Sequence, residues 1–355
     1  MMEIPDMRLF TFQGSHSEIG LAIGKTFSHQ IQKTLADNVE LQKTFLSFHR
    51  TAEGKRKYQK LIQLHNSRFP QYLSELKGIS EGAEVSLEEL FLVNLRGEYR
   101  SYVKATSNSG CSTCSVLTPD NAVFGHNEDG SPIYNDQMYL VRVEITGKPA
   151  FTALCYPGFL PGNSCGFNQE GVCFSVNSLQ PKRVAIGAGR HFIARSLFEA
   201  KNLDEAIQRV TIAGRASGFN YTIGSMKERR MVDVEVSPTN HHVFEIKGYF
   251  FHANHYIKLS GVDESATPSS QARQSRGEAL LRGGVAQDKT GILNVLRDYK
   301  VRDYPILRDG EPPDTGMTLI TAFFDLDSKR LTLYPGGLAK KKHRFEPLIE
   351  ILMGE

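Results

Sequence analysis

Five cysteines between residues 111 and 173 supply the strongest candidate nucleophiles of the chain. Cys111 follows Gly110 at the end of a run of small residues, Ser107-Asn108-Ser109, directly before the first strand predicted after the helical N-terminal part. Glycine leaves a neighbouring thiol accessible and permits the strained backbone that attack on the preceding carbonyl requires. Composition alone favours a buried structural thiol, whereas the local pattern suits a nucleophile that cleaves the Gly110–Cys111 bond.

Cleavage of that bond would give Cys111 a free α-amine. An unperturbed α-amine has a pKa near ~8, so it can act as general base for its own thiol around neutral pH. One residue would then supply both the nucleophile and the base.

Other motifs offer alternatives. Cys111 and Cys114 form a C-x-x-C pair, and with His252 and His255 they would make a four-ligand zinc site or a redox centre. The two pairs lie about 140 residues apart, unlike a zinc finger, and a strand rather than a helix is predicted after Cys114. A Gly-x-Ser-x-Gly match around Ser164 precedes a strand instead of a helix, so we interpret it as accidental.

The composition is that of an ordinary globular protein. The 355 residues are 40% hydrophobic and 23% charged, with a net charge of +3, which suits one large domain or two smaller ones. The basic run Lys340-Lys341-Lys342 is more typical of a solvated edge than of a nucleic-acid site. We therefore expect no nucleic-acid partner.

The sequence also indicates a compartment. No apolar run reaches the roughly 20 residues that span a bilayer, residues 1–6 lack signal-peptide features, and an odd cysteine count argues against a disulfide framework. We expect a cytoplasmic protein without a membrane partner, a cofactor or a bound metal.

Hydrophobic spacing divides the chain into helical and strand-rich parts. Helices are predicted from residue 15 to about 49 and at 54–68, 71–82, 86–100, 190–200, 203–213, 269–281 and 290–298. Strands are predicted at 8–13, 115–117, 122–127, 138–144, 150–155, 172–176, 219–224, 231–236, 242–246, 249–252, 317–325 and 330–334. This order predicts an α+β fold in which helices cover antiparallel sheets.

Two details within the N-terminal helices bear on packing and function. Gly20 and Gly24 fall on one helix face and predict close packing against another element. Asn94, Arg96 and Glu98 form either an exposed charged face or a polar cluster turned toward Cys111.

Several blocks, in the same order, resemble the family of acyl-coenzyme A:6-aminopenicillanic acid acyltransferases, which are N-terminal nucleophile hydrolases. The resemblance covers nearly the whole chain. The blocks are Phe12-Gln13-Gly14 with Glu18-Ile19-Gly20, Gly78-Ile79 with Gly82-Ala83-Glu84, Asn94-x-Arg96-x-Glu98, Gly110-Cys111-Ser112-Thr113, Gly125-His126-Asn127-Glu128-Asp129, Gly166-Phe167-Asn168 and Phe251-His252-Ala253-Asn254-His255.

The resemblance implies a four-layer αββα fold and a division of labour in the site. Cys111 would be the self-cleaving residue and the nucleophile, Asp129 would hold its new amine, and Asn254 would help form the oxyanion hole. Residues 1–110 would remain attached as a non-covalent small subunit of the large subunit 111–355. Without the resemblance, Asp129 and Asn254 would be interpreted as turn and loop residues.

The chain also departs from the family. The family has an arginine in its site near the place where this chain has Asp314-Thr315-Gly316, and Glu128 replaces an aromatic residue. Arg273 and Arg276 match arginines of related members and would supply positive charge instead. Asn177 would line the pocket, as the related bile-salt hydrolase pattern suggests.

These features predict an amide-bond hydrolase or acyltransferase that acts on a small acylated amine, amino acid or peptide through a thioester on Cys111. The penicillin nucleus and coenzyme A thioesters are doubtful substrates because of the departures. A zinc- or redox-dependent protein and a non-catalytic ligand-binding relative are the alternatives, and a homo-oligomer is possible.

Overall fold

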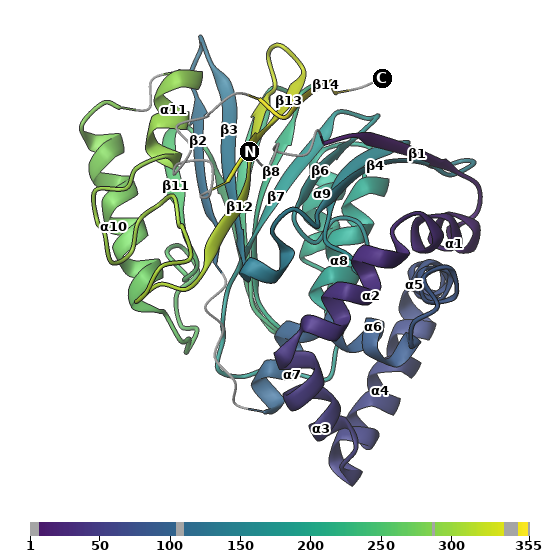
Figure 1. The fold of residues 1–355 in the computed structure, drawn as a ribbon. Helices are drawn as coiled ribbons and strands as arrows, with labels where there is room; N and C mark the ends of the chain where they lie inside the picture. Colours follow the sequence, from purple (N-terminus) through teal and green to yellow (C-terminus); the bar gives the residue numbers. More distant parts are fainter. Residues whose placement is uncertain (1–6, 104–109, 286–287, 337–346, 354–355) are drawn as a thin grey trace, which may run out of the picture.

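The computed structural model describes residues 7–103, 110–285, 288–336 and 347–353. Two sheets face each other in the middle, with helices α1–α9 covering one and α10 and α11 covering the other (Figure 1). The predicted αββα arrangement is therefore confirmed. Residues 107–109 of the predicted nucleophile loop, the basic run at 340–342 and the chain start at 1–6 lie outside the described residues.

The larger sheet contains eight strands in the order β1-β4-β5-β6-β7-β8-β9-β10. Neighbours are antiparallel except β1, which pairs in parallel with β4 and so attaches the N-terminal part to a sheet that the rest of the chain builds. The strands are β1 Leu9–Gln13, β4 Tyr139–Glu144, β5 Phe151–Cys155, β6 Cys165–Asn168, β7 Val172–Ser178, β8 Phe219–Ser225, β9 Arg230–Val236 and β10 His241–Glu245.

The smaller sheet contains six antiparallel strands in the order β11-β2-β3-β12-β13-β14. The aromatic rings of Phe124 and Phe324 stack at 4.5 Å in the core that lies between the sheets. The strands are β2 Ser112–Leu117, β3 Ala122–Gly130, β11 Gly248–His252, β12 Met317–Asp325, β13 Arg330–Pro335 and β14 Ile349–Leu352.

Most helices lie on the outer face of the larger sheet (Figure 1). They are α1 His16–Thr26, α2 Ser28–Asp37, the π-helix η1 Glu40–Phe45, α3 Leu46–His49, α4 Ala52–Arg68, α5 Pro70–Ala83, α6 Leu87–Asn94, α7 Arg96–Tyr102, α8 Arg190–Ser196, the 3-10 helix η3 Leu197–Glu199 and α9 Leu203–Val210. A further 3-10 turn, η2, spans Pro132–Tyr134. Within the described ranges, none of the helices combines the length and apolarity needed to cross a bilayer.

The other helical layer consists of α10 Pro268–Arg282 and α11 Lys289–Leu296. α11 packs against β2 and β3 so closely that a Cβ on Gly125 would lie 2.5 Å from Leu296 Cδ1. Cys114 belongs to this outer core, on the side of the smaller sheet away from the larger one.

Glycine allows the close packing of α1 against α5 that the sequence predicted. A Cβ on Gly20 would lie 2.0 Å from the Glu75 carbonyl oxygen, and one on Gly24 would lie 2.4 Å from that of Ile79. Backbone-to-backbone packing of this kind leaves no room for any side chain.

Two helix predictions were wrong. The helix expected up to residue 49 is interrupted at Phe27 and at Asn38, and the Phe27 ring stacks on that of Tyr139 of β4, with ring centroids 3.6 Å apart. The helix expected over 86–100 is divided at Leu95, and β14 was not predicted.

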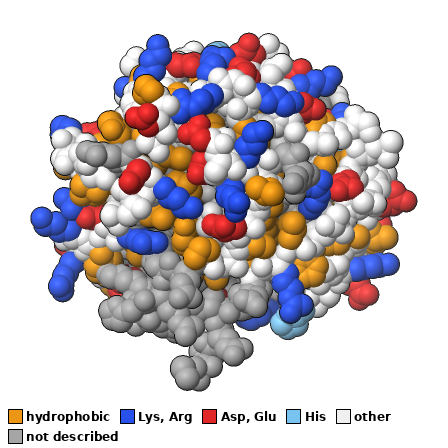
Figure 2. Space-filling view, turned by 90° about the horizontal axis from the view of Figure 1, so that it is seen from above, with side chains coloured by type: hydrophobic (Ala, Val, Ile, Leu, Met, Phe, Trp, Pro, Cys, Tyr) orange, Lys and Arg blue, Asp and Glu red, His pale blue; other side chains and the backbone are white. Residues whose placement is uncertain are grey.

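Charged side chains of opposite sign are interspersed on the face shown in Figure 2.

Candidate active site

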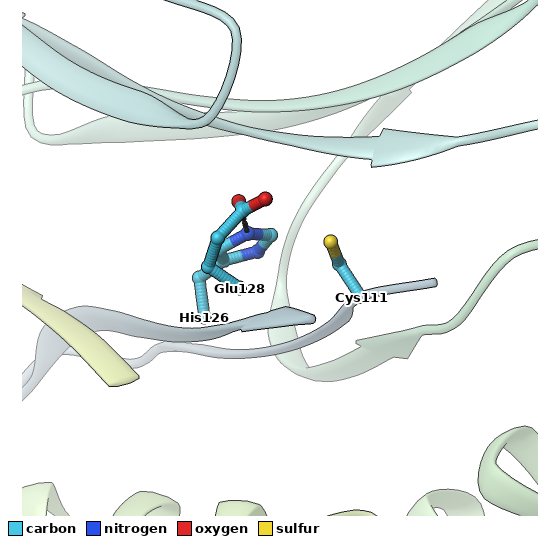
Figure 3. A group of neighbouring side chains, drawn as sticks. All are labelled: Cys111, His126 and Glu128. Atoms are coloured by element: carbon cyan, nitrogen blue, oxygen red, sulfur yellow. Dashed lines mark hydrogen bonds and ion pairs between the residues drawn. The ribbon is translucent and has the colours of Figure 1, made fainter. Parts of the chain in front are cut away.

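Cys111 directly precedes β2 and lies between the two sheets. The register of β2 and β3 pairs Ser112 with Asn127 and Thr113 with His126. Figure 3 shows the side chains of Cys111, His126 and Glu128 extending from these strands toward the facing sheet. The hairpin therefore brings a thiol and the alternate residues of β3 into one buried space.

The Cys111 thiol is held in its neutral form in the intact chain. Its side chain is only 5% exposed, and Sγ lies 4.0 Å from the Asp129 carbonyl oxygen. Burial raises the pKa of the thiol well above its usual value, and the negative charges of Glu128 and Asp129 raise it further. The thiol therefore needs a nearby base or a concerted proton transfer before it can attack.

The carbonyl that precedes Cys111 is held by an arginine that sequence analysis missed. Arg308 Nη1 donates to the Gly110 carbonyl oxygen at 3.0 Å. The same guanidinium is paired with Asp314, 2.9 Å from Nε, and with Asp129, 3.5 Å from Nη1. Burial lowers the pKa of Arg308, but the two carboxylates outweigh it and keep the side chain charged. A positive charge is thus fixed on the bond that would break.

Gly316 makes room for this arginine. A Cβ at residue 316 would lie 1.9 Å from Arg308 Nη2. The Asp314-Thr315-Gly316 segment, which lacks the family arginine in sequence, therefore holds a different arginine that lies six residues before Asp314. An acidic residue at the expected position of a cation was the available signal for a displaced arginine.

Arg273, which was predicted to supply positive charge, reaches the nucleophile segment from α10. Its Nη1 donates to the Cys111 carbonyl oxygen and to Ser112 Oγ, both at 2.8 Å, and its Nη2 donates to Asn254 Oδ1 at 2.8 Å. Burial and the neighbouring Arg308 lower the pKa of Arg273 to about 10. Arg273 fixes both the nucleophile segment and the Asn254 amide.

The orientation of the Asn254 side chain follows from these contacts. Because Arg273 donates to Oδ1, Nδ2 must point the other way, where it donates to the Ser178 carbonyl oxygen at 3.0 Å. The Asn254 side chain is close to Gly110, since a Cβ built on Gly110 would lie 2.5 Å from Asn254 Oδ1. In the intact chain the Asn254 side-chain amide thus donates to the Ser178 carbonyl oxygen. Arg308, rather than Asn254, donates to the Gly110 carbonyl oxygen.

Asp129 is 2% exposed and has one oxygen to spare. Its Oδ2 contacts Arg308, whereas Oδ1 has no hydrogen-bond partner among the described residues. Burial raises the pKa of Asp129 to about 6, although the nearby arginines oppose the shift. A buried carboxylate oxygen without a partner is suited to receive an ammonium group.

His126 and Glu128 form a hydrogen-bonded pair close to the thiol. Asn177 donates through Nδ2 to the carbonyls of residues 252 and 253, so its Oδ1 accepts from Thr113 Oγ1 at 2.8 Å, and Thr113 must then accept from His126 Nδ1 at 2.9 Å. His126 Nε2 faces Glu128 Oε2 at 3.1 Å. These contacts fix the orientation of both side chains beside the thiol.

Cys111, His126 and Glu128 each have one potential metal-ligand atom, and these three atoms lie within 4.8 Å of one another. This spacing is close enough to consider a metal ion. However, Glu128 Oε1 already accepts from Tyr156 and Oε2 from Ser164, both at 2.6 Å. These short bonds satisfy the carboxylate without a metal ion.

The alternative zinc site does not assemble. Cys114 lies in the outer core, and His252 is bonded to Glu235 at 2.8 Å. Among the described residues, neither Cys114 nor His255 belongs to a cluster of side chains that could hold a metal ion. The register explains this, because residues 111 and 114 point to opposite faces of a strand.

The remaining predicted residues have other contacts. Both polar side-chain atoms of Asn177 form hydrogen bonds that join β7 to the smaller sheet. Arg276 pairs with Asp298 at 2.6 Å and does not line the cavity at Cys111. Glu128 does line that cavity.

A cavity of about 20 Å³, room for about one water molecule, adjoins Cys111. Sequence analysis missed most of its wall, which comes from loops and helices far apart in the chain. It is lined by Arg96, Gly110, Cys111, Glu128, Asp129, Asn163, Val176, Ser178, Arg190, His191 and Phe219.

The chain belongs to the acyl-coenzyme A:6-aminopenicillanic acid acyltransferase family, whose sequence profile matches residues 116–340. It is 28% identical to the beta-alanyl-dopamine/carcinine hydrolase of Drosophila melanogaster over 354 aligned positions, with 91% of each chain covered. It is 26% identical to the acyl-coenzyme A:6-aminopenicillanic-acid-acyltransferase 40 kDa form of Emericella nidulans, with 92% of each chain covered.

Solved structures with lower similarity include a Caenorhabditis elegans N-acylethanolamine-hydrolyzing acid amidase ortholog. The two chains are 13% identical with a TM-score of 0.45, and the match covers 61% of this chain and 92% of that one. A variant of the conjugated bile acid hydrolase from Clostridium perfringens matches at 11% identity and a TM-score of 0.42, covering 63% of this chain and 89% of that one.

Proposed function

We propose that the protein is a self-processing amidohydrolase or acyltransferase whose nucleophile is an N-terminal cysteine, Cys111. The observation that carries this proposal is the contact of Arg308 with the Gly110 carbonyl, directly beside a buried thiol. The relatives named as a hydrolase and an acyltransferase support amide chemistry on a small acylated amine, amino acid or peptide.

Processing would begin when Sγ attacks the Gly110 carbonyl carbon. A C–S bond forms, the C–N bond to Cys111 breaks, and the thiol proton ends on the departing nitrogen. Water then hydrolyses the thioester, which releases the Gly110 carboxylate and restores the thiol. Arg308 stabilises the negative charge on the oxygen, and Asp129 Oδ1 receives the new ammonium.

In the mature enzyme the α-amine of Cys111 would take the thiol proton and give it to the leaving amine of the substrate. The acyl group would remain on Sγ as a thioester until water or another amine accepts it. Arg273 holds the nucleophile segment and Asn254 during both steps, and Asn254 would add an oxyanion donor once its amide hydrogen is released from Ser178.

The N-terminal part would stay bound after cleavage. Its strand β1 completes the larger sheet beside β4, and its helices cover that sheet. We propose that residues 1–110 and 111–355 are the small and large subunits of one folded body. The five free, buried cysteines suit the cytoplasmic location that we expect.

Denaturing mass spectrometry of the purified protein tests the proposal. Two fragments divided between Gly110 and Cys111 are expected, with masses that sum to 39.7 kDa plus one water. Cys111→Ala should remain one chain and lose acyl-transfer activity by roughly 10⁴-fold or more, because the nucleophile is gone.

Cys114→Ala is the matched control, since it removes a buried thiol three residues away on the opposite face of the strand. It should be cleaved normally. A wild-type chain that stays intact and whose Cys111 resists thiol-directed acylating probes would contradict the proposal.

A further inference from the structure

Besides Asp129 Oδ1, several other polar atoms in the wall of the cavity at Cys111 have no partner among the described residues. Among the described residues, both amide atoms of Asn163, Nδ1 of His191, and Nε of Arg96 and of Arg190 are buried without a hydrogen bond. Asn163 and Arg190 are each 5% exposed and His191 is 1% exposed. Buried polar groups in proteins are normally satisfied, so several unsatisfied ones around one space indicate a ligand.

Arg190 is held rigidly at this wall. Its guanidinium lies 4.0 Å from the centre of the Phe219 ring, and Nη1 donates to Ser178 Oγ at 2.9 Å. On its other side it packs against Gly97, where a Cβ would lie 2.3 Å from Cζ. The aromatic ring and the glycine leave the side chain one position.

The charge of Arg190 lacks a direct counter-ion. Of the other buried arginines, Arg195 and Arg308 form ion pairs with carboxylates, whereas Arg215 and Arg273 donate to uncharged acceptors. Within the described residues the Arg190 guanidinium forms no ion pair and donates to one hydroxyl, that of Ser178. Glu98 accepts from the Arg190 backbone N–H at 3.0 Å rather than from the guanidinium. Burial lowers the pKa of Arg190 to about 10, and Glu98 only partly opposes the shift.

Arg96 connects this wall to the outside. It lines both the cavity and an open groove of about 500 Å³ that also includes Arg100 and Thr315. The cavity and the groove therefore have one arginine in common as part of their walls.

A cationic substrate would find no equivalent site among the described residues of the cavity. The carboxylate of Glu128 is already occupied by Tyr156 and Ser164, and the spare oxygen of Asp129 is assigned to the α-amine of the cleaved chain. Once the α-amine has taken the Asp129 oxygen, the charges of the cavity wall that lack a counter-ion among the described residues are those of Arg190 and Arg96.

We propose that Arg190 and Arg96 form a carboxylate-binding subsite, so that the substrate is an acylated amine that carries a carboxylate. Asn163 and His191 bind neighbouring polar atoms of the same molecule. This inference rests on the proposed function. The carboxylate belongs either to the amine, as in an N-acyl amino acid, or to the acyl group, as in a succinyl amide.

Alkylation of Cys111 in the processed enzyme tests the subsite without knowledge of the substrate. The reagents are matched pairs, iodoacetate with iodoacetamide and 3-iodopropionate with its amide, which differ only in charge. For the wild type, we compare the alkylation rate constant of each anionic reagent with that of its neutral partner. This ratio should be about 10- to 100-fold higher for Cys111 than for a free thiol, which is the range for a hydrogen bond to a charged group.

Arg190→Gln should abolish this gain, and Arg190→Lys should retain part of it. Gly97→Ala, which displaces the guanidinium without removing it, should act like Arg190→Gln. Arg276→Gln is the control, because Arg276 pairs with Asp298 at 2.6 Å and lines neither the cavity nor the groove. Each variant is first checked for cleavage by mass spectrometry.

The source of the carboxylate follows from turnover of two pairs, N-acetylglycine with its amide and N-methylsuccinamate with its amide. An equal anion preference in wild type, Arg190→Gln and Gly97→Ala would overturn the subsite while leaving the nucleophile intact. If Cys111 reacts with neither member of a pair, the proposed function itself fails.

Discussion

Two groups of polar residues near Cys111, one around the cleavage site and one in the wall of the cavity, differ in how their polar atoms are satisfied. On what we call the paired side, around the cleavage site, Arg273 donates to Asn254 and to the Cys111 carbonyl oxygen. Arg308 donates to the Gly110 carbonyl oxygen. On the unpaired side, Asn163 and Arg190 keep atoms without partners among the described residues. On the paired side the intact chain leaves only Asp129 Oδ1 without a partner among the described residues, and the new ammonium would take it. On the unpaired side several atoms wait for a ligand.

This difference separates the reaction of the chain on itself from the reaction on a substrate. The self-cleavage that we propose would need only groups that already surround the Gly110 carbonyl. Substrate binding needs groups that the folded chain leaves unsatisfied, at a cost in stability that a ligand would offset.

Arg308 should give the largest effect on the paired side. Arg308→Gln removes the charge that contacts the Gly110 oxygen, so self-cleavage is expected to slow by about 10²–10³-fold, as for loss of an oxyanion donor. The rate is measured by following the intact chain after synthesis or refolding. Arg276→Gln, which breaks a surface-side pair with Asp298, is the control. Equal cleavage rates in wild type and Arg308→Gln would show that the contact is only structural.

Two buried asparagines compare the sides directly through stability. Asn177 has all its polar side-chain atoms bonded, and Asn163 has none bonded within the described ranges. Asn177→Leu should lower the free energy of unfolding by about 2–4 kcal/mol, because it leaves buried partners unsatisfied. Asn163→Leu should change it by less than about 1 kcal/mol or increase it, while weakening substrate binding.

Urea unfolding of both variants is measured in a Cys111→Ala background, so that every protein unfolds as one chain. Equal losses at the two positions would remove the distinction between the sides.

Asp129 gives the smallest expected effect, and it appears as a pH dependence. With its pKa raised to about 6, Asp129 is mostly ionised at pH 7 and mostly protonated at pH 5. Because the ionised form receives the new ammonium, self-cleavage should slow by about tenfold for each pH unit below 6. Rates between pH 4.5 and 8 test this, and Asp129→Asn should be slow without that step. A wild-type profile that is flat through pH 6 would exclude the role.

Hydrophobic period and glycine spacing predicted most of the fold. The strands β3 and β12, the helix α10 and the packing of Gly20 and Gly24 follow from local patterns that tertiary contacts reinforce. The break at Phe27, whose ring contacts Tyr139 more than a hundred residues later, could not be predicted from local patterns.

The site was predictable where a motif carried it and not where distant residues met. Cys111, Asp129 and Arg273 were predicted and lie together. Arg308 and Arg190 were missed because their roles depend on Gly316 and Gly97, which make room for them only in the folded chain.

The pairing of β1 with β4 has a consequence for how each molecule can refold. In the uncleaved chain, the strand returns to its place by a search within one chain. In the cleaved form that we propose, the same strand would belong to a separate chain, and reassembly would depend on concentration. The mature enzyme would therefore survive by unfolding slowly rather than by refolding well, and dilution after denaturation would lose it permanently.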